Sequence, residues 1–331
     1  MRLKKLSTNP IIEPRQKNKW EAWQTFNPAA ILLDNNVHFL YRAIGENCIS
    51  CLGYASSKDG FTINKRLSYP VFKHNSNNSS FNTYFYSSGG SWGGAEDPRI
   101  VRVGKEDRLY MTYTACDNGL RVALTSIKLD DFLNKRWKWE PSVFLSSPDE
   151  VHKNWVIFPE KINNKYAILH SISPEIAIDY FDSLEFDNSV YINSYYNCEL
   201  RKNCWDSWVR GAGAPPIKTK YGWLIFYHAM DDDWTKYKVG ALLLDLKDPT
   251  KEIARSLESV LEPDKKYENN GFKAGIVYVS GAVVKNGKLL VYYGCSDSYV
   301  GVAYANLDEF LEALMKKTKP KLKHKINKKT K

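Results

Sequence analysis

KYGWLIFYHAM (residues 220–230) is the stretch that decides the fold, because its pattern recurs along the chain. It consists of a turn, a short apolar run, an aromatic residue or His, and then a polar residue. Four other segments share this order, with starts roughly 55–70 residues apart: NNVHFLYRA (35–43), EDRLYMTYTA (106–115), NNKYAILHSI (163–172) and NGKLLVYYGCSD (286–297). A pattern repeated at quasi-regular spacing indicates a repeat architecture.

Each repeat is followed by a second segment with the character of a β-strand. The apolar runs are short, rich in Val, Ile, Tyr and Phe, and bounded by Asn, Asp or Gly, which is typical of strands. These second segments are CISCLGYASS (48–57), LRVALTSI (120–127), IAIDYFDS (176–183), YKVGALLLD (237–245) and YVGVAYAN (299–306). Helical periodicity occurs only in DDFLNKRW (130–137) and LDEFLEALMKK (307–317). The sequence therefore predicts an all-β fold, a five-bladed β-propeller with short helical additions.

The polar residues that end the five repeats could meet in one place. A β-sandwich could also use ten strands, but it would not need the same motif five times. Strands of a propeller blade run towards or away from the mouth of the central channel, so these side chains could point into a shared pocket. They are Arg42, Thr114, Ser171, His228 and Asp297. An ordinary polar residue at a strand end is the alternative interpretation for any one of them.

The net charge of +10 belongs to the C-terminal end of the chain. Residues 316–331 contain nine Lys and no acidic residue, so the rest of the chain carries only +1. We expect residues 1–315 to form a single catalytic propeller domain and the Lys-rich tail 316–331 to be disordered. A nearly neutral body argues against a nucleic-acid partner.

The cysteines and the N-terminus bear on location. Cys48 and Cys51 form one CxxC motif without a second pair at zinc-ribbon spacing, so we expect reduced thiols and no metal site. The N-terminal MRLKKLSTNPIIEP lacks the apolar region of a signal peptide, and no run of 18 apolar residues occurs. These features predict a cytoplasmic protein with no membrane partner. The 10 Trp and 21 Tyr would suit stacking on sugar rings, although aromatic-rich strands explain them equally well.

GGAEDPRI (93–100) places two carboxylates and an Arg around a Pro. Pro98 disfavours the helical region for Asp97, which predicts an extended turn. Arg99 and Glu96 could shift the pKa of Asp97 in opposite directions. A surface turn with a salt bridge is the alternative interpretation.

GAGAPPIKT (211–219) is a loop of small residues that ends near Lys218. It could surround a ligand or form a tight connection between blades. The phosphate-loop spacing GxxxxGK[ST] is absent, as are HExxH, GxSxG and the dinucleotide fingerprint.

In their order along the chain, these motifs resemble glycoside hydrolase family 130, the β-mannoside phosphorylases and β-mannosidases. The resemblance covers residue 27 to about residue 305 and is carried by NPAAILLDNNVHFLYRA (27–43), GGAEDPRI, FPEKINNKYAILH (158–170), GAGAPPIKT and LLVYYGCSD. It implies an inverting enzyme that cleaves β-mannosidic linkages in manno-oligosaccharides. It also implies that Asp97 is the proton donor, acting through the sugar 3-hydroxyl, and that Asn27, Arg42 and Asp297 bind the mannose being transferred.

The resemblance further implies a basic phosphate cluster in the phosphorylases. The matching or neighbouring positions hold Lys153, Asn154, Ser171, Lys218 and His228. Phosphorylases have His-Arg where this chain has His170-Ser171, and Ser cannot replace the bidentate grip of Arg on phosphate. The sequence therefore favours hydrolysis, a β-mannosidase. The alternative is a β-mannoside phosphorylase that releases mannose 1-phosphate, with inorganic phosphate as co-substrate and no other cofactor.

Either activity places demands on carboxyl groups. As an acid, Asp97 must be protonated at neutral pH, which requires a pKa raised by burial or by Glu96. Hydrolysis also needs a carboxylate base roughly 6.5–9.5 Å from the acid, for which Glu268 and the cluster 231–233 are candidates. A non-catalytic carbohydrate-binding propeller is a second alternative. The linkage, 1,2 or 1,4, and the assembly into a homo-oligomer stay open, although family members often assemble.

Overall fold

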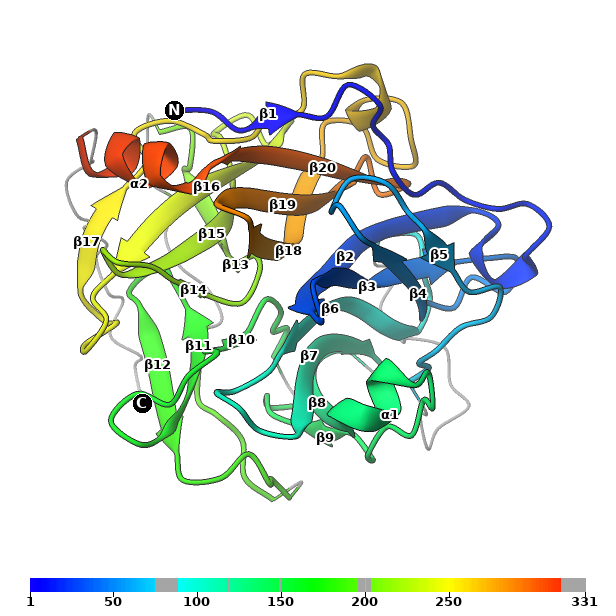
Figure 1. Cartoon of the computed structure of the whole chain (residues 1–331), viewed down its shortest axis with the longest axis horizontal. Helices are drawn as coiled ribbons and strands as arrows, with labels where there is room; N and C mark the ends of the chain where they lie inside the picture. Colours follow the sequence, from blue (N-terminus) through cyan, green and yellow to red (C-terminus); the bar gives the residue numbers. More distant parts are fainter. Residues whose placement is uncertain are drawn as a thin grey trace.

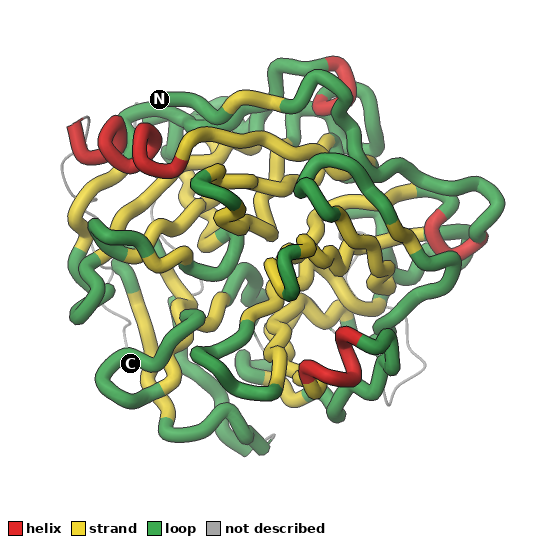
Figure 2. The backbone as a smooth tube through the Cα atoms, viewed as in Figure 1, coloured by secondary structure: helices red, strands yellow, loops and turns green. Residues whose placement is uncertain are grey.

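Five antiparallel sheets surround a common centre, as the repeat predicted (Figure 1). This computed structural model describes residues 1–74, 89–117, 119–148, 150–187, 189–195, 200 and 204–316. Each sheet is one blade of a five-bladed β-propeller. Figure 2 shows that helix is confined to the rim of the molecule.

The blades follow one another in chain order. Blade 1 contains β2 (Gln24–Leu33), β3 (Asn36–Ile44), β4 (Cys51–Ser57) and β5 (Lys65–Arg66). Blade 2 contains β6 (Gly94–Val101), β7 (Arg108–Cys116), β8 (Leu120–Lys128) and β9 (Val143–Phe144). Blade 3 contains β10 (Val156–Ile157), β11 (Tyr166–Ser171) and β12 (Ala177–Phe181).

Blades 4 and 5 complete the ring. Blade 4 contains β13 (Trp208–Ala212), β15 (Trp223–Met230), β16 (Tyr237–Leu244) and β17 (Glu252–Arg255), with β14 (Ile217–Lys218) also paired to β15. Blade 5 contains β18 (Val277–Lys285), β19 (Lys288–Cys295) and β20 (Tyr299–Asn306). Its outer strand is β1 (Lys4–Lys5), which comes from the other end of the chain and pairs with β20. The pairing of β1 with β20 joins the N-terminal segment, which continues into blade 1, to the last blade.

The ten predicted strands are confirmed as β3, β7, β11, β15 and β19 and their partners β4, β8, β12, β16 and β20. The sequence analysis did not predict the first strand of each blade. These first strands are β2, β6, β10, β13 and β18. In four of the five blades this strand changes register with its neighbour, for example between Phe26 and Ala29 and between Glu96 and Arg99. Such bulges interrupt the period-2 alternation on which strand prediction depends.

The helices are short. α1 (Leu129–Leu133) ends earlier than the predicted 130–137, since Lys135 adopts a left-handed backbone with a φ of 59°. α2 (Leu307–Lys316) matches its prediction and buries Phe310 and Leu314 against blades 4 and 5. η1 (Lys19–Glu21) and η2 (Lys266–Glu268) are single 3₁₀ turns. Of the predicted disordered tail, all but Lys316 lies outside the described residues. Within the described part of the chain, no helix has the length and hydrophobicity needed to cross a membrane.

The hydrophobic core consists of five clusters, each filled from two adjacent blades. On β3, Leu40 packs towards blade 2, whereas Phe39 and Tyr41 pack towards blade 5. Both faces of the strand are therefore buried, as the alternation of side chains in a strand allows. Each buried side chain of this size stabilises the fold by about 1.5–3 kcal/mol. The packing fixes the blades relative to one another and so positions the residues at their inner ends.

Candidate active site

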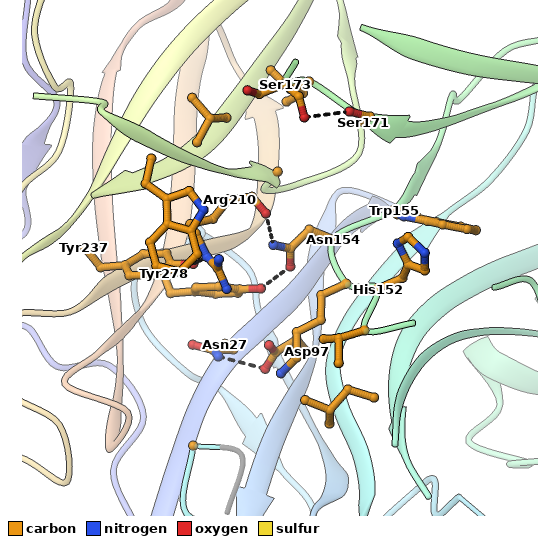
Figure 3. A pocket seen from close by; sticks show the side chains of 18 of the residues that line it. Asn27, Asp97, His152, Asn154, Trp155, Ser171, Ser173, Arg210, Tyr237 and Tyr278 are labelled. Carbon is orange, nitrogen blue, oxygen red and sulfur yellow. Dashed lines mark hydrogen bonds between the residues drawn. The ribbon is translucent and has the colours of Figure 1, made fainter. Parts of the chain in front are cut away.

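A cavity of about 620 Å³ is lined by side chains from all five blades (Figure 3). Its volume lies within the usual range for small-molecule sites. Six of the predicted site residues line it: Asn27, Arg42, Asp97, Lys153, Asn154 and Asp297. Of the five polar residues that end the repeats, Arg42, Ser171 and Asp297 reach the cavity, whereas Thr114 and His228 are buried outside its lining.

Four of the six predicted residues in the lining have an unusual backbone. The φ values are 45° for Asn27, 48° for Asp97, 67° for Asn154 and 50° for Asp297. Positive φ is uncommon except in Gly, and Asn and Asp adopt it more readily than other side chains. Asn27 and Asp97 each lie in a bulge, and a bulge re-aims the side chain. The predicted extended turn at Asp97 is therefore wrong, since the bulge places this residue in the left-handed region.

The Asp97 carboxylate is held by two neighbours from blade 1. Asn27 Nδ2 donates a hydrogen bond of 2.8 Å to Asp97 Oδ1, and Arg42 Nη1 lies 3.2 Å from the same oxygen. The other terminal nitrogen of Arg42, Nη2, lies 3.2 Å from Glu96 Oε1. Asp97 is only 3% exposed. Its carboxylate is thus fixed in position by a network that spans blades 1 and 2.

Gly294 makes room for this network. A Cβ atom at Gly294 would lie 1.9 Å from Asn27 Oδ1. The glycine of the YYG motif therefore allows blade 5 to approach the side chain that binds Asp97.

The two carboxyl groups of the site are shifted in opposite directions. Burial alone would raise the pKa of Asp97, but the nearby cations of Arg42, Lys153 and Arg99 outweigh it and lower the pKa to about 2. Burial raises the pKa of Asp297 to about 6, with a further rise from Asp97 and an opposing effect of Arg42. The prediction that the pKa of Asp97 is raised is therefore wrong for this state of the site. The cations around Asp97 hold it ionised at neutral pH.

Arg99 links Asp97 to the next blades. Its Nη1 donates 2.6 Å to the main-chain oxygen of Asp97, and its Nη2 donates 2.7 Å to Asn154 Oδ1. Tyr278 donates to the same Asn154 oxygen. Lys153 Nζ, next to Asn154 in the chain, lies 3.0 Å from Glu96 Oε2. The side chains of blades 2, 3 and 5 are thereby joined around the cavity.

Arg210, which the sequence analysis missed, forms part of the opposite wall. Its main-chain oxygen accepts a 2.8 Å hydrogen bond from Asn154 Nδ2, and its Nε donates 3.2 Å to the Tyr237 hydroxyl. Its guanidinium carbon lies 3.8 Å from the centre of the Trp208 ring. In Figure 3, Arg210 lies on the far side of Asn154 from Asp97. The only sequence signal was a Trp and an Arg two residues apart, immediately before GAGAPPIKT.

Ser171 and His170 line the cavity on blade 3. Ser171 Oγ donates 3.0 Å to the main-chain oxygen of Ser173, and His170 Nδ1 lies 2.9 Å from Ser194 Oγ. Ser171 supplies no charge, as the sequence indicated.

Lys218 and Glu268, which the sequence analysis named as site candidates, lie outside the cavity lining. Lys218 is exposed and paired with Glu160, because β14 pairs with the Trp223 end of β15 rather than with the His228 end. Glu268 is fully buried, where it accepts hydrogen bonds from Lys5 Nζ and the Tyr293 hydroxyl. Neither residue is placed to contact a ligand in this cavity.

His228 lies beneath the wall. Its ring stacks on Tyr278 with centroids 3.9 Å apart, and its Nε2 lies 2.7 Å from the Val279 carbonyl oxygen. Burial and the nearby Arg99 lower its pKa to about 3, so the ring is neutral and supports the wall of the cavity. In the cluster 231–233, Asp231 pairs with Lys238 at 2.7 Å.

Comparison with known proteins gives a consistent result. The profile of glycoside hydrolase family 130, described as beta-1,4-mannooligosaccharide phosphorylase, matches residues 2–316. A 1,2-beta-oligomannan phosphorylase of Thermoanaerobacter sp. (strain X514) is 38% identical over 93% of this chain and 99% of its own length. A beta-1,2-mannobiose phosphorylase of the same organism is 34% identical over 91% of this chain and 96% of its own length.

Solved structures show the same fold. One is described by the words "The GH130 family of mannoside phosphorylases contains glycoside hydrolases that target beta-1,2 mannosidic linkages in Candida mannan". It superposes with a TM-score of 0.75 at 26% sequence identity, over 92% of this chain and 94% of its own.

Proposed function

The chain belongs to glycoside hydrolase family 130, and from that premise we propose that it is a β-mannoside phosphorylase acting on β-1,2-linked manno-oligosaccharides. Two relatives with phosphorylase names align over more than nine-tenths of the chain, which supports phosphorolysis. The preference for hydrolysis that we drew from Ser171 finds no support in these relatives, and we replace it.

The observation that carries this proposal is the set of cations in the cavity wall. Lys153, Arg210 and Lys273 line the same cavity as Asp97. A phosphate dianion is bound best by several cationic donors, and a guanidinium can bind two of its oxygens at once. Phosphorylases of the family have an Arg on blade 3 at the position of Ser171. In this chain Arg210, on blade 4, would supply a guanidinium in its place. The hydrogen bond from its Nε to Tyr237 orients it and leaves the terminal N–H groups for phosphate.

The residues of blades 1, 2 and 5 would hold the transferred sugar. Asn27, Arg42 and Asp297 surround Asp97, and the family resemblance assigns them to the mannose ring. Both hydrogen bonds to the Asp97 carboxylate end on Oδ1, so we assign Oδ2 to the substrate. Phosphate would attack the anomeric carbon from the opposite face. A bond from phosphate oxygen to this carbon forms, the glycosidic bond breaks, and the leaving oxygen takes up one proton.

Phosphate would also prepare Asp97 for its role. An ionised Asp97 cannot donate a proton, and its low pKa arises from Arg42, Lys153 and Arg99. An anion placed beside Lys153 offsets this positive charge and raises the pKa of the carboxyl group. Asp97 would give one proton to the leaving oxygen through the sugar 3-hydroxyl, and the proton that hydrogen phosphate loses when its oxygen bonds to the anomeric carbon restores the carboxyl group, so the reaction balances. Proton donation is thereby coupled to the presence of the co-substrate.

Product analysis tests the function. The protein is incubated with β-1,2- or β-1,4-mannobiose, with and without phosphate, and the products are followed by ³¹P NMR and chromatography. We expect mannose 1-phosphate from the β-1,2-linked substrate only when phosphate is present. Free mannose released at the same rate without phosphate would show a hydrolase and refute the proposal.

A further inference from the structure

Two Trp side chains line the cavity at its solvent-exposed edge. Trp208 begins β13, and Trp234 lies in the turn between β15 and β16. Their ring centroids are 4.8 Å apart and their planes are tilted by 38°. Trp234 is 51% exposed, in contrast to the nearly complete burial of Asp97. The pair therefore marks the shallow end of the cavity, and the network around Asp97 marks the deep end.

The Trp pair is held in place by its neighbours. The Arg210 guanidinium covers one side of the Trp208 ring, and Trp234 is the more exposed ring of the pair. Trp234 has a φ of 55°, a conformation that bulky side chains rarely adopt. Such a backbone persists only where the surroundings determine it, and it is often found at ligand sites. The exposed ring is thus presented in a defined way.

We propose that Trp208 and Trp234 form a subsite that stacks on the third mannosyl ring of the substrate, counted from the ring that is transferred. An indole surface matches the apolar C–H face of a pyranose. This inference rests on the proposed function. Because the transferred ring occupies the buried end with Asn27 and Arg42, the rest of the oligosaccharide must extend towards the exposed end.

The third ring follows from the order of side chains along the wall. Asp97 is joined through Arg99 to Asn154, and Asn154 is joined to the Arg210 main chain. The Arg210 side chain then lies between this point and Trp208. Because Arg99, Asn154 and Arg210 lie in that order between Asp97 and the Trp pair, we place the pair beyond the reach of a disaccharide held at Asp97. The enzyme should therefore use trisaccharides and longer substrates better than mannobiose.

Kinetics with substrates of different length test the subsite. At saturating phosphate, kcat/KM is measured for β-1,2-linked mannobiose, mannotriose and mannotetraose. We expect Trp234→Ala to lower kcat/KM about fivefold for the two longer substrates and to leave mannobiose unchanged. Trp234→Phe should retain most of the preference. Tyr221→Ala is the matched control, since Tyr221 is 37% exposed in the turn before β15 and does not line the cavity. An equal loss on all three substrates, or no loss on any, overturns the proposal.

Binding without turnover separates the subsite from the proposed reaction. Mannotriose should quench the tryptophan fluorescence of the Asp97→Asn protein more than mannobiose does, and this difference should vanish when Trp234→Ala is added. Failure to produce mannose 1-phosphate would refute the proposed function and leave this binding result intact. Equal quenching by the two sugars would refute the subsite.

Discussion

At the deep end of the cavity, Asn27, Arg42, Glu96 and Asp97 are joined in one network of hydrogen bonds and ion pairs, and all four are buried. At the shallow end, the Arg210 side chain contacts the Tyr237 hydroxyl and the Trp208 ring within the described part of the chain, next to the exposed Trp234. A preorganised network costs little rearrangement when its ligand binds, and it tolerates little change. The difference indicates that the deep end recognises one sugar ring in one pose. The shallow end provides charge for phosphate and apolar surface for further rings.

The largest expected effect comes from removing the acid at the deep end. Asp97→Asn should lower kcat/KM by about 10³-fold, because a positioned general acid contributes about 10²–10⁴-fold. Steady-state phosphorolysis of β-1,2-mannobiose measures it. Asp107→Asn, an exposed carboxylate in the turn before β7, serves as the control and should be unaffected. Retention of more than a tenth of the activity by Asp97→Asn would remove Asp97 from the chemistry.

A methyl group should suffice to disturb the deep end. In Gly294→Ala the new Cβ would meet Asn27 Oδ1 at 1.9 Å, and Asn27 would have to release Asp97. We expect kcat/KM to fall by about 10²-fold, as for a displaced positioning group. Gly287→Ala is the comparison, because Gly287 has a φ of 73° but open space around it. That variant should lose stability and keep its kinetic constants. Normal kinetics for Gly294→Ala would argue against a rigid deep end.

At the shallow end, the change should appear in phosphate binding alone. Arg210→Ala should raise the KM for phosphate by about tenfold or more, since one charge-assisted pair contributes about 1.5–3 kcal/mol. Arg210→Lys should recover part of this loss, because Lys keeps the charge without the bidentate geometry. Lys218→Ala should leave the KM for phosphate unchanged. If Lys218→Ala raised the KM for phosphate more than Arg210→Ala does, Lys218 would be the phosphate ligand, as the sequence analysis expected, and our assignment of Arg210 would be wrong.

Lys218 illustrates which parts of the site the sequence could predict. The ten strands were predicted because their apolar runs and turns are local features. The position of a side chain after GAGAPPIKT depends on pairing with a strand further along, and register places Lys218 opposite Trp223. Trp234 gave no pattern of its own, and the only signal for Arg210 was its spacing from Trp208. They reach the cavity only because β13 and the β15–β16 turn end at it.

The charge state of Asp97 could not be predicted from the sequence either, because it also depends on residues that are distant in the chain. Burial and Glu96 were local features that favour a raised pKa, and Arg99 was the one local feature that lowers it. The opposing cations include Arg42, which is 55 residues away in the chain and reaches Asp97 only across the boundary between two blades. Asn27, Arg42 and Asp297 were assigned through the family resemblance, and the structure brings them together around Asp97.

The smallest expected effect concerns stability and pH. The folded pKa of Asp297 is raised to about 6, so the folded state holds this proton more tightly than the unfolded chain does. Its contribution to stability is full below pH 4 and is lost as the pH rises through 6. We therefore compare the Tm of Asp297→Asn with that of the unsubstituted protein at each pH. This difference should be about 2 °C more positive at pH 8 than at pH 4.

Asp97 should behave in the opposite way. Its folded pKa is lowered to about 2, so it stabilises the fold above pH 4 and loses this contribution as the pH falls towards 2. Asp97→Asn should lower the Tm at pH 7. Thermal melts of both variants between pH 4 and pH 8 check the pair, and shifts of the same sign at pH 8 would contradict the assigned charge states.

The reverse reaction tests the central claim, transfer between sugar and phosphate, most directly. The protein is supplied with mannose 1-phosphate and mannose, and the release of inorganic phosphate is followed together with the formation of β-1,2-mannobiose. We predict that phosphate appears only when mannose is present and in equal amount to the disaccharide. Phosphate released without an acceptor, or no disaccharide at all, would contradict the account.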